Sequence, residues 1–288
     1  MIYTTVVSSD LVQSHLASWA IVDCRFDLQD DAWGREQYRA AHIAGAVYAS
    51  LSENLAGART PTSGRHPLPS IDTLAAFFSR LGIDRATQVV VYDQDSGLFA
   101  SRLWWSLRYL GHDAVALLDG GWAKWMAEGR PTRGGDESRA PRAFVAAPRP
   151  HMAVTIDDVR SRIDDRGTLL VDARGPDRFE GRAEPIDRVA GHIPGATNHF
   201  YRWNLGEAGT MLPPEQLRDT YTALLDGRAP DQAIVYCGSG VSACHNLLAM
   251  EHAGLRGTRL YVGSWSEWSQ DSSRPVETGP ARTSSQSS

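Results

Sequence analysis

A cysteine at the end of a short apolar run is the residue of this sequence best placed to do chemistry. Residues 233–236 (Ala-Ile-Val-Tyr) are too few for an ordinary helix and β-branched enough for a buried strand. Cys237 and a glycine-containing loop follow, and residues 243–253 are typical of a helix. At such a junction the backbone N–H groups point toward the sulfur and favour thiolate over thiol. The sequence therefore predicts a nucleophilic cysteine, with a small buried core cysteine as the alternative.

Length and charge limit what kind of protein this is. The 288 residues have room for two domains, and a net charge of −5 without a basic cluster gives no reason to expect nucleic acid or an anionic membrane as partner. There is no apolar run of about 18 to 20 residues and no signal-peptide pattern after Met1, so we expect a cytoplasmic protein. Cys24, Cys237 and Cys244 do not suggest a disulfide framework and fit a reducing compartment.

The elements that would position Cys237 occur in a sequence that repeats itself. Four phrases recur in the same order at offsets of 143 to 150 residues, which indicates a duplication. The matched pairs are residues 22–25 with 171–174, 41–46 with 191–196, 89–92 with 233–236, and 119–125 with 262–268. In each half, short apolar runs alternate with helical stretches such as 70–81, 97–110 and 214–225. This alternation predicts an α/β fold in which each half has a mainly parallel sheet flanked by helices.

The composition changes where the halves meet and again at the end. Residues 133–150 are rich in Arg, Pro, Gly and Ala without periodicity, as in an exposed linker. We therefore expect an N-terminal domain at 1–132 and a catalytic C-terminal domain at 151–269. Residues 270–288 have few apolar side chains and are expected to form a disordered tail.

The duplication supplies an internal control for Cys237. Its counterpart in the first half is Asp93, whose polar side chain is poorly suited to a hydrophobic core. The position is therefore better explained as the start of an open loop in both halves. Only one half keeps a thiol, and we expect one catalytic site per chain. His42 and His192 occur in both halves, as do pairs of tryptophans and the strand-terminal aspartates Asp23 and Asp172. These shared residues are predicted to be structural.

These phrases resemble the tandem-domain rhodanese sulfurtransferases over nearly the whole chain up to Trp268. The resemblance depends on the two α/β halves, on His-Ile-Pro-Gly-Ala at 192–196, on Asp-Gly-Gly-Trp at 119–122, and on Cys-Gly-Ser-Gly-Val at 237–241. The cysteine loop is similar to that of the 3-mercaptopyruvate sulfurtransferase branch. Thiosulfate-preferring members usually carry basic residues directly after the cysteine, and here there are none. The resemblance implies two tandem rhodanese-like domains, the first non-catalytic.

The resemblance also implies a reaction. The Cys237 thiolate would take the outer sulfur of a small-molecule donor as a persulfide and release it to a thiol acceptor such as thioredoxin, or to cyanide. Backbone N–H groups of Gly238, Gly240, Val241 and Ser242 would hold the anionic sulfur. No cofactor and no metal is expected.

A carboxylate-bearing donor needs a cation, and arginine can bind a carboxylate bidentately. Arg178 lies in Asp-Arg-Phe-Glu-Gly (177–181), which is similar to a phrase that contacts substrate in the family. For the second arginine that such relatives often have, Arg188 is the candidate, although neither it nor Arg182 lies in register. Because the loop itself is neutral, we prefer 3-mercaptopyruvate to the dianion thiosulfate.

Pyruvate leaves as an enolate or enol, so a proton donor is expected near Ser239. The phrase Gly-Arg-His-Pro-Leu-Pro at 64–69 resembles a loop that in the family brings a histidine to this serine, which makes His66 the second member of a catalytic relay. Where relatives commonly carry an aspartate, this sequence has Ser52, followed by Glu53. Substitution by Glu53 and loss of the relay both stay open.

Other interpretations of the same loop differ in how well they fit. A Cys-x5-Arg phosphatase is disfavoured because position 243 is Ala. A metal site made of Cys237, Cys244 and His245 lacks the ligand spacing of structural zinc. Cys244 is either a resolving thiol or a buried helix residue. A thiosulfate:cyanide sulfurtransferase and a non-turnover persulfide relay or regulatory module remain the alternative functions.

Overall fold

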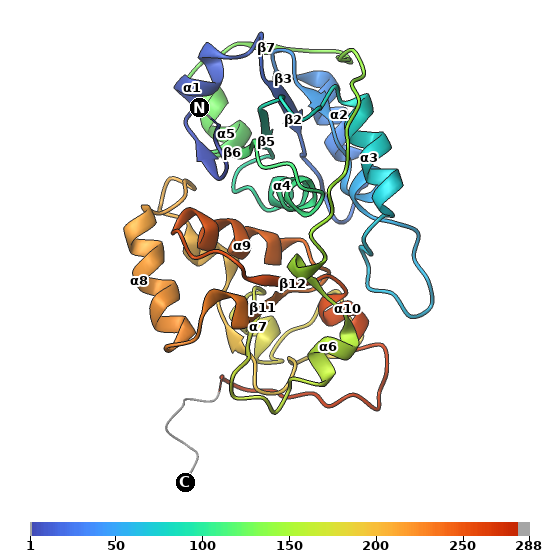
Figure 1. Ribbon diagram of the computed structural model, residues 1–288, viewed down its shortest axis with the longest axis vertical. Helices are drawn as coiled ribbons and strands as arrows, with labels where there is room; N and C mark the ends of the chain where they lie inside the picture. Colours follow the sequence, from blue (N-terminus) through green and yellow to red (C-terminus); the bar gives the residue numbers. More distant parts are fainter. Residues whose placement is uncertain (1, 282–288) are drawn as a thin grey trace. The chain divides into compact units, whose positions relative to one another are not determined.

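The structure of the chain, a computed structural model, describes residues 2–281 and consists of two compact units (Figure 1). The first unit contains residues 2–58, 68–150 and 205–211. The second contains residues 59–67, 151–204 and 212–281. Each unit is therefore made of segments that are not continuous in the sequence. Segment 59–67, which we expected in the N-terminal domain, belongs to the second unit, and the predicted linker 133–150 belongs to the first.

A five-stranded parallel sheet in the order β1-β6-β5-β2-β4 forms the centre of the first unit. Its strands are β1 (Val6–Val7), β2 (Ala20–Asp23), β4 (Val47–Tyr48), β5 (Val89–Tyr92) and β6 (Val115–Leu118). The strands β3 (His42–Ile43) and β7 (Thr132–Arg133) form a separate antiparallel pair. The helices are α1 (Ser9–Ser14), α2 (Trp33–Ala40), the π-helix η1 (Leu51–Leu55), α3 (Ile71–Arg80), α4 (Ala100–Tyr109) and α5 (Gly121–Ala127).

The second unit repeats this plan with a parallel sheet in the order β10-β9-β11-β12-β8. Its strands are β8 (Ala153–Val154), β9 (Leu169–Asp172), β10 (Thr197–Asn198), β11 (Ala233–Tyr236) and β12 (Arg259–Tyr261). Its α-helices are α6 (Ile156–Arg160), α7 (Pro176–Phe179), α8 (Pro214–Leu225), α9 (Ser242–His252) and α10 (Ser264–Trp268). Short 3-10 helices are η2 (Pro150–Met152), η3 (Tyr201–Asn204) and η4 (Pro230–Gln232).

The two sheets confirm the predicted fold class. Because β2 and β9, β5 and β11, and β6 and β12 occupy equivalent places in the two strand orders, the sequence repeat is also a structural repeat. The expected strand at 233–236 and helix at 214–225 have the observed bounds, and the helix expected at 243–253 begins and ends one residue earlier. All four residues of β5, Val-Val-Val-Tyr, are fully buried. The strand has no polar face because strands of parallel sheets are usually covered on both sides.

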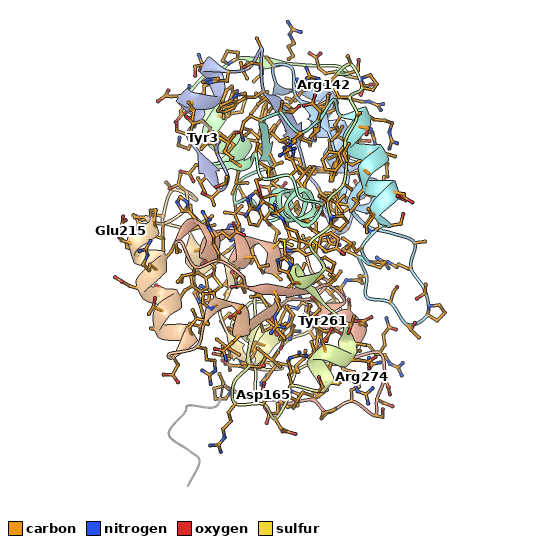
Figure 2. The ribbon with its side chains drawn as sticks, in the orientation of Figure 1. Tyr3, Arg142, Asp165, Glu215, Tyr261 and Arg274 are labelled. Atoms are coloured by element: carbon orange, nitrogen blue, oxygen red, sulfur yellow. The ribbon has the colours of Figure 1, made fainter. Side chains whose placement is uncertain are left out.

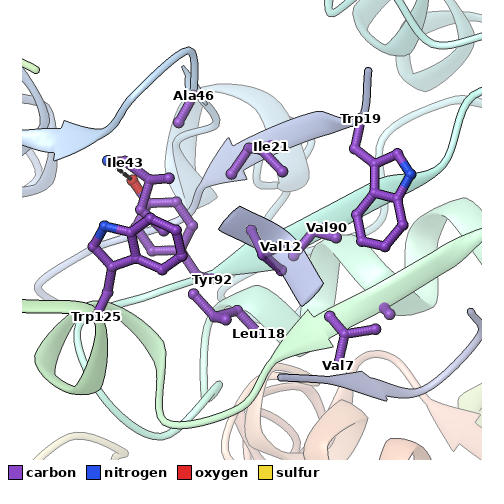
Figure 3. Packing of buried hydrophobic residues seen from close by; sticks show 11 residues of the cluster. Val7, Val12, Trp19, Ile21, Ile43, Ala46, Val90, Tyr92, Leu118 and Trp125 are labelled. Carbon is purple, nitrogen blue, oxygen red and sulfur yellow. Dashed lines mark hydrogen bonds between the residues drawn. The ribbon is translucent and has the colours of Figure 1, made fainter. Parts of the chain in front are cut away.

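One face of each sheet is packed by aromatic and aliphatic side chains. In the first unit Val90, Tyr92 and Trp125 belong to a buried cluster, in which Tyr92 Oη accepts a hydrogen bond from Ile43 N (Figure 3). The second unit repeats this arrangement: Tyr236 Oη accepts from Ile193 N at 3.2 Å. The clusters fix the central strands β5 and β11, and each of these strands ends at one of the two aligned loops.

The end of the chain differs in part from the expected disordered tail. Residues 270–281 are held on the second unit, where His192 and Glu277 form an antiparallel bridge and Arg274, labelled in Figure 2, donates to the carbonyl of Trp268. Residues 282–288 of the predicted tail lie outside the described residues. Within the described part of the chain, no helix has the length and apolar character that crossing a membrane requires.

Candidate active site

Cys237 lies where the sequence places it, directly after β11 and five residues before the start of α9. The side chain is 2% exposed, and the backbone N–H of Gly240 donates a hydrogen bond to Cys237 Sγ at 3.1 Å. Gly240 has φ +74°, a left-handed conformation that glycine adopts without steric cost, and this turn brings its N–H back toward the sulfur. The loop can therefore stabilise negative charge on sulfur.

The beginning of α10 fixes the backbone around the cysteine. Cys237 N donates to Ser264 Oγ at 3.1 Å, and Cys237 O accepts from Trp265 N at 2.9 Å. Ser264 Oγ in turn donates to Tyr261 O at 2.9 Å. Ser264 is fully buried and has φ +55°, which is uncommon for a residue with a side chain. A strained serine thus holds the thiol-bearing residue in place.

Ser239 and His66 form the expected pair, with His66 Nδ1 2.8 Å from Ser239 Oγ. Both residues are 6% exposed. Segment 59–67 can approach this closely because Gly64 has no side chain: a Cβ there would lie 2.4 Å from the carbonyl oxygen of Gly263. A hydroxyl hydrogen-bonded to an imidazole two residues from a thiol is suited to delivering a proton.

Two guanidinium groups lie against Gly238, the residue next to Cys237. A Cβ at position 238 would meet Arg65 Nη2 at 2.8 Å and Arg178 Nη2 at 3.5 Å. The structure thus brings the predicted Arg178 to the loop together with Arg65, which the sequence did not single out. The sequence predicted a loop without an extra cation, and this prediction was wrong. Arg65 and Arg178, which are distant from the loop in sequence, bring positive charge to the space beside Gly238.

An alternating series of acids and arginines leads from the sheet to the loop. Its members, in contact order, are Asp172, Arg174, Glu184, Arg178, Asp187 and Arg65. The inner part is buried and structural: Arg174 has a 1% exposed side chain and stacks on Trp265. The outer part reaches solvent, since the side chains of Arg178 and Arg65 are each 21% exposed. The series therefore ends in two cations that a ligand can approach.

The two acids of the outer part differ in their titration. Burial raises the pKa of Asp187, and the opposing charge of Arg65 only partly offsets this. Burial would likewise raise the pKa of Glu184, but hydrogen bonds from Arg178 and the backbone outweigh it and the pKa is lowered. Glu184 is the more firmly ionised of the two.

The remaining predicted site residues lie in different surroundings. Val241 and Ser242 mark the N-cap and first residue of α9, whereas Arg188 is exposed. Glu53 pairs with Arg35 and Ser52 Oγ lies 3.2 Å from Ser50 Oγ, all within the first unit.

The second cysteine of this region lies in the helix. Cys244 is fully buried on α9, and its Sγ donates to Gly240 O at 3.3 Å. His245 Nδ1 lies 3.2 Å from Asn204 Nδ2, which places that ring in a separate buried polar network.

The residues shared by the halves have structural partners, as the duplication predicted. Asp23 pairs with Arg25, as Asp172 pairs with Arg174. The side chains of His42 and His192 each lie within hydrogen-bond distance of a backbone carbonyl oxygen.

Sequence reasoning missed Arg65, Asp187 and Ser264. Arg65 had a signal, because it precedes His66 in the phrase that carried the relay. Ser264 also had one, since it replaces Gly121 of the first half at an otherwise matching position. Asp187 had none, because its role comes from its contacts alone.

The family described as rhodanese-like domain matches residues 8–128 and again residues 155–271. A protein of Pseudomonas aeruginosa, provisionally named 3-mercaptopyruvate sulfurtransferase, is 46% identical over 261 residues, which are 90% of this chain and 92% of the relative. A protein of Mycobacterium tuberculosis, provisionally named thiosulfate sulfurtransferase, is 38% identical over 274 residues, 91% of this chain and 92% of the relative.

A similar solved structure is the 3-mercaptopyruvate sulfurtransferase of Leishmania major. It matches with a TM-score of 0.84 and 31% identity, and the match covers 95% of this chain and 76% of that one. Both repeats, and nearly the full length of the chain, therefore match proteins that are named as sulfurtransferases.

Proposed function

Because the chain belongs to the rhodanese-like family, we propose that it is a sulfurtransferase that takes sulfur from 3-mercaptopyruvate and passes it to a thiol or to cyanide through a persulfide on Cys237. One observation carries the proposal. Cys237 Sγ accepts the N–H of Gly240 in the same loop in which Ser239 Oγ lies 2.8 Å from His66 Nδ1. A nucleophile and a proton source thus lie two residues apart.

The first half-reaction moves one sulfur atom. The Cys237 thiolate attacks the sulfur of 3-mercaptopyruvate, an S–S bond forms, and the C–S bond breaks with its electron pair passing to the carbon as pyruvate enolate. Protonation through Ser239, coupled to His66, turns the enolate into pyruvate. Arg178 binds the carboxylate of the donor.

The second half-reaction restores the enzyme. An acceptor thiolate attacks the outer sulfur of the persulfide, the S–S bond breaks, and the Cys237 thiolate leaves with the electron pair of that bond. The N–H of Gly240 supports the thiolate in both half-reactions. A small thiol protein such as thioredoxin is the acceptor we propose, in a cytoplasmic setting that fits the three cysteines, none of which forms a disulfide in the described part of the chain.

Thiosulfate is the second candidate donor, and the arginine pair favours it. Two guanidinium groups beside Gly238 suit a small dianion, and sulfite can leave without being protonated. The ratio of kcat/KM for 3-mercaptopyruvate and thiosulfate decides between the two donors. A ratio above one supports the proposed donor, and a ratio well below one assigns the chain to thiosulfate.

The test of the mechanism compares two cysteine variants. Cys237→Ser should abolish sulfur transfer and the mass increase of one sulfur atom on the peptide that contains residue 237. Cys244→Ser is the matched control, because Cys244 is buried in the first turn of α9, and it should keep both signals. Sulfur transfer that survives in Cys237→Ser would rule the mechanism out. Loading of Cys237 without turnover of either donor would instead indicate a persulfide relay.

A further inference from the structure

The second unit contains a loop that has no counterpart in the first. In the first unit Tyr38 stacks on His42, with the two ring centroids 4.2 Å apart, and the equivalent rings of Phe179 and His192 in the second unit are 3.8 Å apart. In both units the histidine Nδ1 also lies within hydrogen-bond distance of the carbonyl oxygen of its aromatic partner. The two partners are four positions apart in the first unit and 13 in the second. Residues 181–190 therefore belong to an insertion, which occurs in the half that carries the thiol.

Both ends of loop 181–190 are held by the last described segment of the chain. Gly279 N donates to Glu180 O at 2.9 Å, directly before the loop. His192 N donates to Glu277 O at 2.8 Å, directly after it. A loop whose ends are fixed in this way loses less conformational entropy when a partner binds to it.

The acids of loop 181–190 are turned toward the protein. Glu184, whose side chain is 3% exposed, accepts the backbone N–H of Ile186 at 3.1 Å and that of Asp187 at 3.0 Å. Glu184 also pairs with Arg178, and Asp187 joins Arg178 to Arg65. The loop is thus anchored to the two guanidinium groups that lie beside the residue after the cysteine.

Two side chains of the loop are left for a ligand outside the protein. Ile186 is 48% exposed, although the acids on either side of it are almost fully buried. Arg188 is exposed, and among residues 2–281 its side chain has no hydrogen-bond or ion-pair partner. The atoms nearest to a Cβ at Gly238 belong to other arginines, so the place beside the cysteine is already taken. An apolar side chain and an unpaired cation, two residues apart on a fixed loop, suit a partner that is apolar and acidic.

We infer that loop 181–190 is the docking contact for the protein that accepts the sulfur, with Ile186 packing on the apolar surface around the acceptor cysteine and Arg188 pairing with a carboxylate beside it. The inference rests on the proposed function for the persulfide on Cys237. Because Cys237 is 2% exposed, a protein acceptor has to bring its thiol to the loop while its remaining surface rests on neighbouring exposed residues. A small acceptor such as cyanide does not need these contacts. The partner that fits is a small acidic thiol protein.

Substitution of Ile186 separates a protein acceptor from a small one. Ile186→Ser should raise KM for reduced thioredoxin by about fivefold or more, because an apolar side chain is no longer buried against the partner. With cyanide, kcat and KM should stay within about twofold of the wild type, which also shows that the variant is folded. The matched control is Leu28→Ser, which removes a 52% exposed apolar side chain of the first unit and should leave both acceptors unaffected. Equal KM values for thioredoxin in wild type and Ile186→Ser would overturn the inference.

The charge of Arg188 is tested by salt. Arg188→Gln should lower kcat/KM for thioredoxin by about threefold or more at low salt, because an exposed cation steers an acidic partner. Raising the salt concentration should lower kcat/KM of the wild type and lower that of the variant less, since salt screens exposed charges. Arg85→Gln removes an exposed arginine of the first unit whose side chain is likewise unpaired within the described residues, and it should keep the wild-type salt dependence. A raised KM for the sulfur donor in Arg188→Gln, with unchanged thioredoxin kinetics, would assign Arg188 to the donor and refute its role in docking.

Loading Cys237 without 3-mercaptopyruvate separates the inference from the proposed donor. The Cys237 thiolate attacks a sulfur of inorganic polysulfide, an S–S bond of the reagent breaks, and the shortened polysulfide leaves with the electron pair. Once excess reagent is removed, Ile186→Ser should pass its sulfur to thioredoxin more slowly than the wild type and to cyanide equally fast. This result supports the inference even if 3-mercaptopyruvate is not turned over, which would refute the donor alone. Loaded wild type that transfers sulfur to cyanide but not to thioredoxin would overturn the docking partner.

Discussion

In the first unit, the loop after β5 is filled by a side chain of its own. The carboxylate of Asp93 accepts hydrogen bonds from the N–H groups of Phe99 at 2.7 Å, Gly97 at 2.8 Å and Ala100 at 3.1 Å. In the second unit, the loop after β11 presents Cys237, whose sulfur accepts the N–H of Gly240 at 3.1 Å. One loop thus uses its N–H groups to bind an internal anion, and the other holds a nucleophile.

The surroundings of the two loops are otherwise alike. Asp93 O accepts from Trp122 N at 2.9 Å, and Cys237 O accepts from Trp265 N at the same distance. The next residue in each loop is held in the same way, by Ala123 N and by Ser266 N. Equivalent backbone hydrogen bonds therefore hold both loops, and the residue at position 93 or 237 decides whether the loop carries an internal carboxylate or a thiol.

The largest expected effect concerns the proton relay of the second loop. The counterpart of Ser239 in the first unit is Asp95, so the relay belongs to one half only. Ser239→Ala should lower kcat with 3-mercaptopyruvate by about a hundredfold, because the enolate loses its proton donor. Turnover of thiosulfate should change little and serves as the control. His66→Gln should have the same effect, and the double variant should be no slower; fully additive losses would contradict a shared relay.

The pH dependence of stability tests the closed loop of the first unit. Burial raises the pKa of Asp93 to about 6, despite the opposing N–H bonds. An acid with a raised pKa stabilises the fold below its unfolded pKa of about 4, and this contribution is lost as the pH rises through about 6. Between pH 4 and pH 7 the free energy of unfolding of the wild type, measured relative to Asp93→Asn, should fall by about 2 kcal/mol.

Urea unfolding at the two pH values measures this difference. Asp165, labelled in Figure 2, is the control of opposite sign, because backbone N–H and hydroxyl bonds from Gly167 and Thr168 lower its pKa. Relative to Asp165→Asn the wild type should gain only a little stability between pH 4 and pH 7, because most of this contribution changes below the unfolded pKa of about 4. A difference from Asp93→Asn that did not vary with pH would show that Asp93 titrates alike in the folded and unfolded chain.

The smallest expected effect concerns Ser264 and its counterpart Gly121, which have φ +55° and +54°. Ser264→Ala keeps the left-handed strain and removes the hydroxyl that accepts from Cys237 N, so it should destabilise the protein by about 1 to 2 kcal/mol. Ser264→Gly also loses the hydroxyl but relieves about 1 kcal/mol of strain. Equal stabilities of these two variants in urea unfolding would show that Ser264 is unstrained.

The same position in the first unit provides a reverse experiment. A Cβ at Gly121 would lie 2.7 Å from Asp93 O, so Gly121→Ala should be destabilising, just as Ser264→Ala should be less stable than Ser264→Gly. If Gly121→Ala is as stable as the wild type while Ser264→Ala is less stable than Ser264→Gly, the two loops are supported differently.

The elements around the site could be predicted because their signals are local. The β-branched run at 233–236 specifies a buried strand, and the glycine-containing loop that follows specifies where the strand ends. The duplication showed that Asp93 and Cys237 are equivalent, and it separated shared structural residues from the thiol. The pairing of His66 with Ser239 was expected from the family resemblance, and the structure places the two side chains in hydrogen-bond contact.

The α/β repeat, the strand–loop–helix at Cys237 and the single thiol loop could all be inferred from the residues and their order. The electrostatics of that loop depend on tertiary contacts. Arg65 and Asp187 are 122 residues apart, and their ion pair forms because Gly64 lets segment 59–67 approach the start of α10. Such contacts depend on packing between distant segments rather than on periodicity, so the charge beside Gly238 could not be inferred from the neutral residues that follow the cysteine.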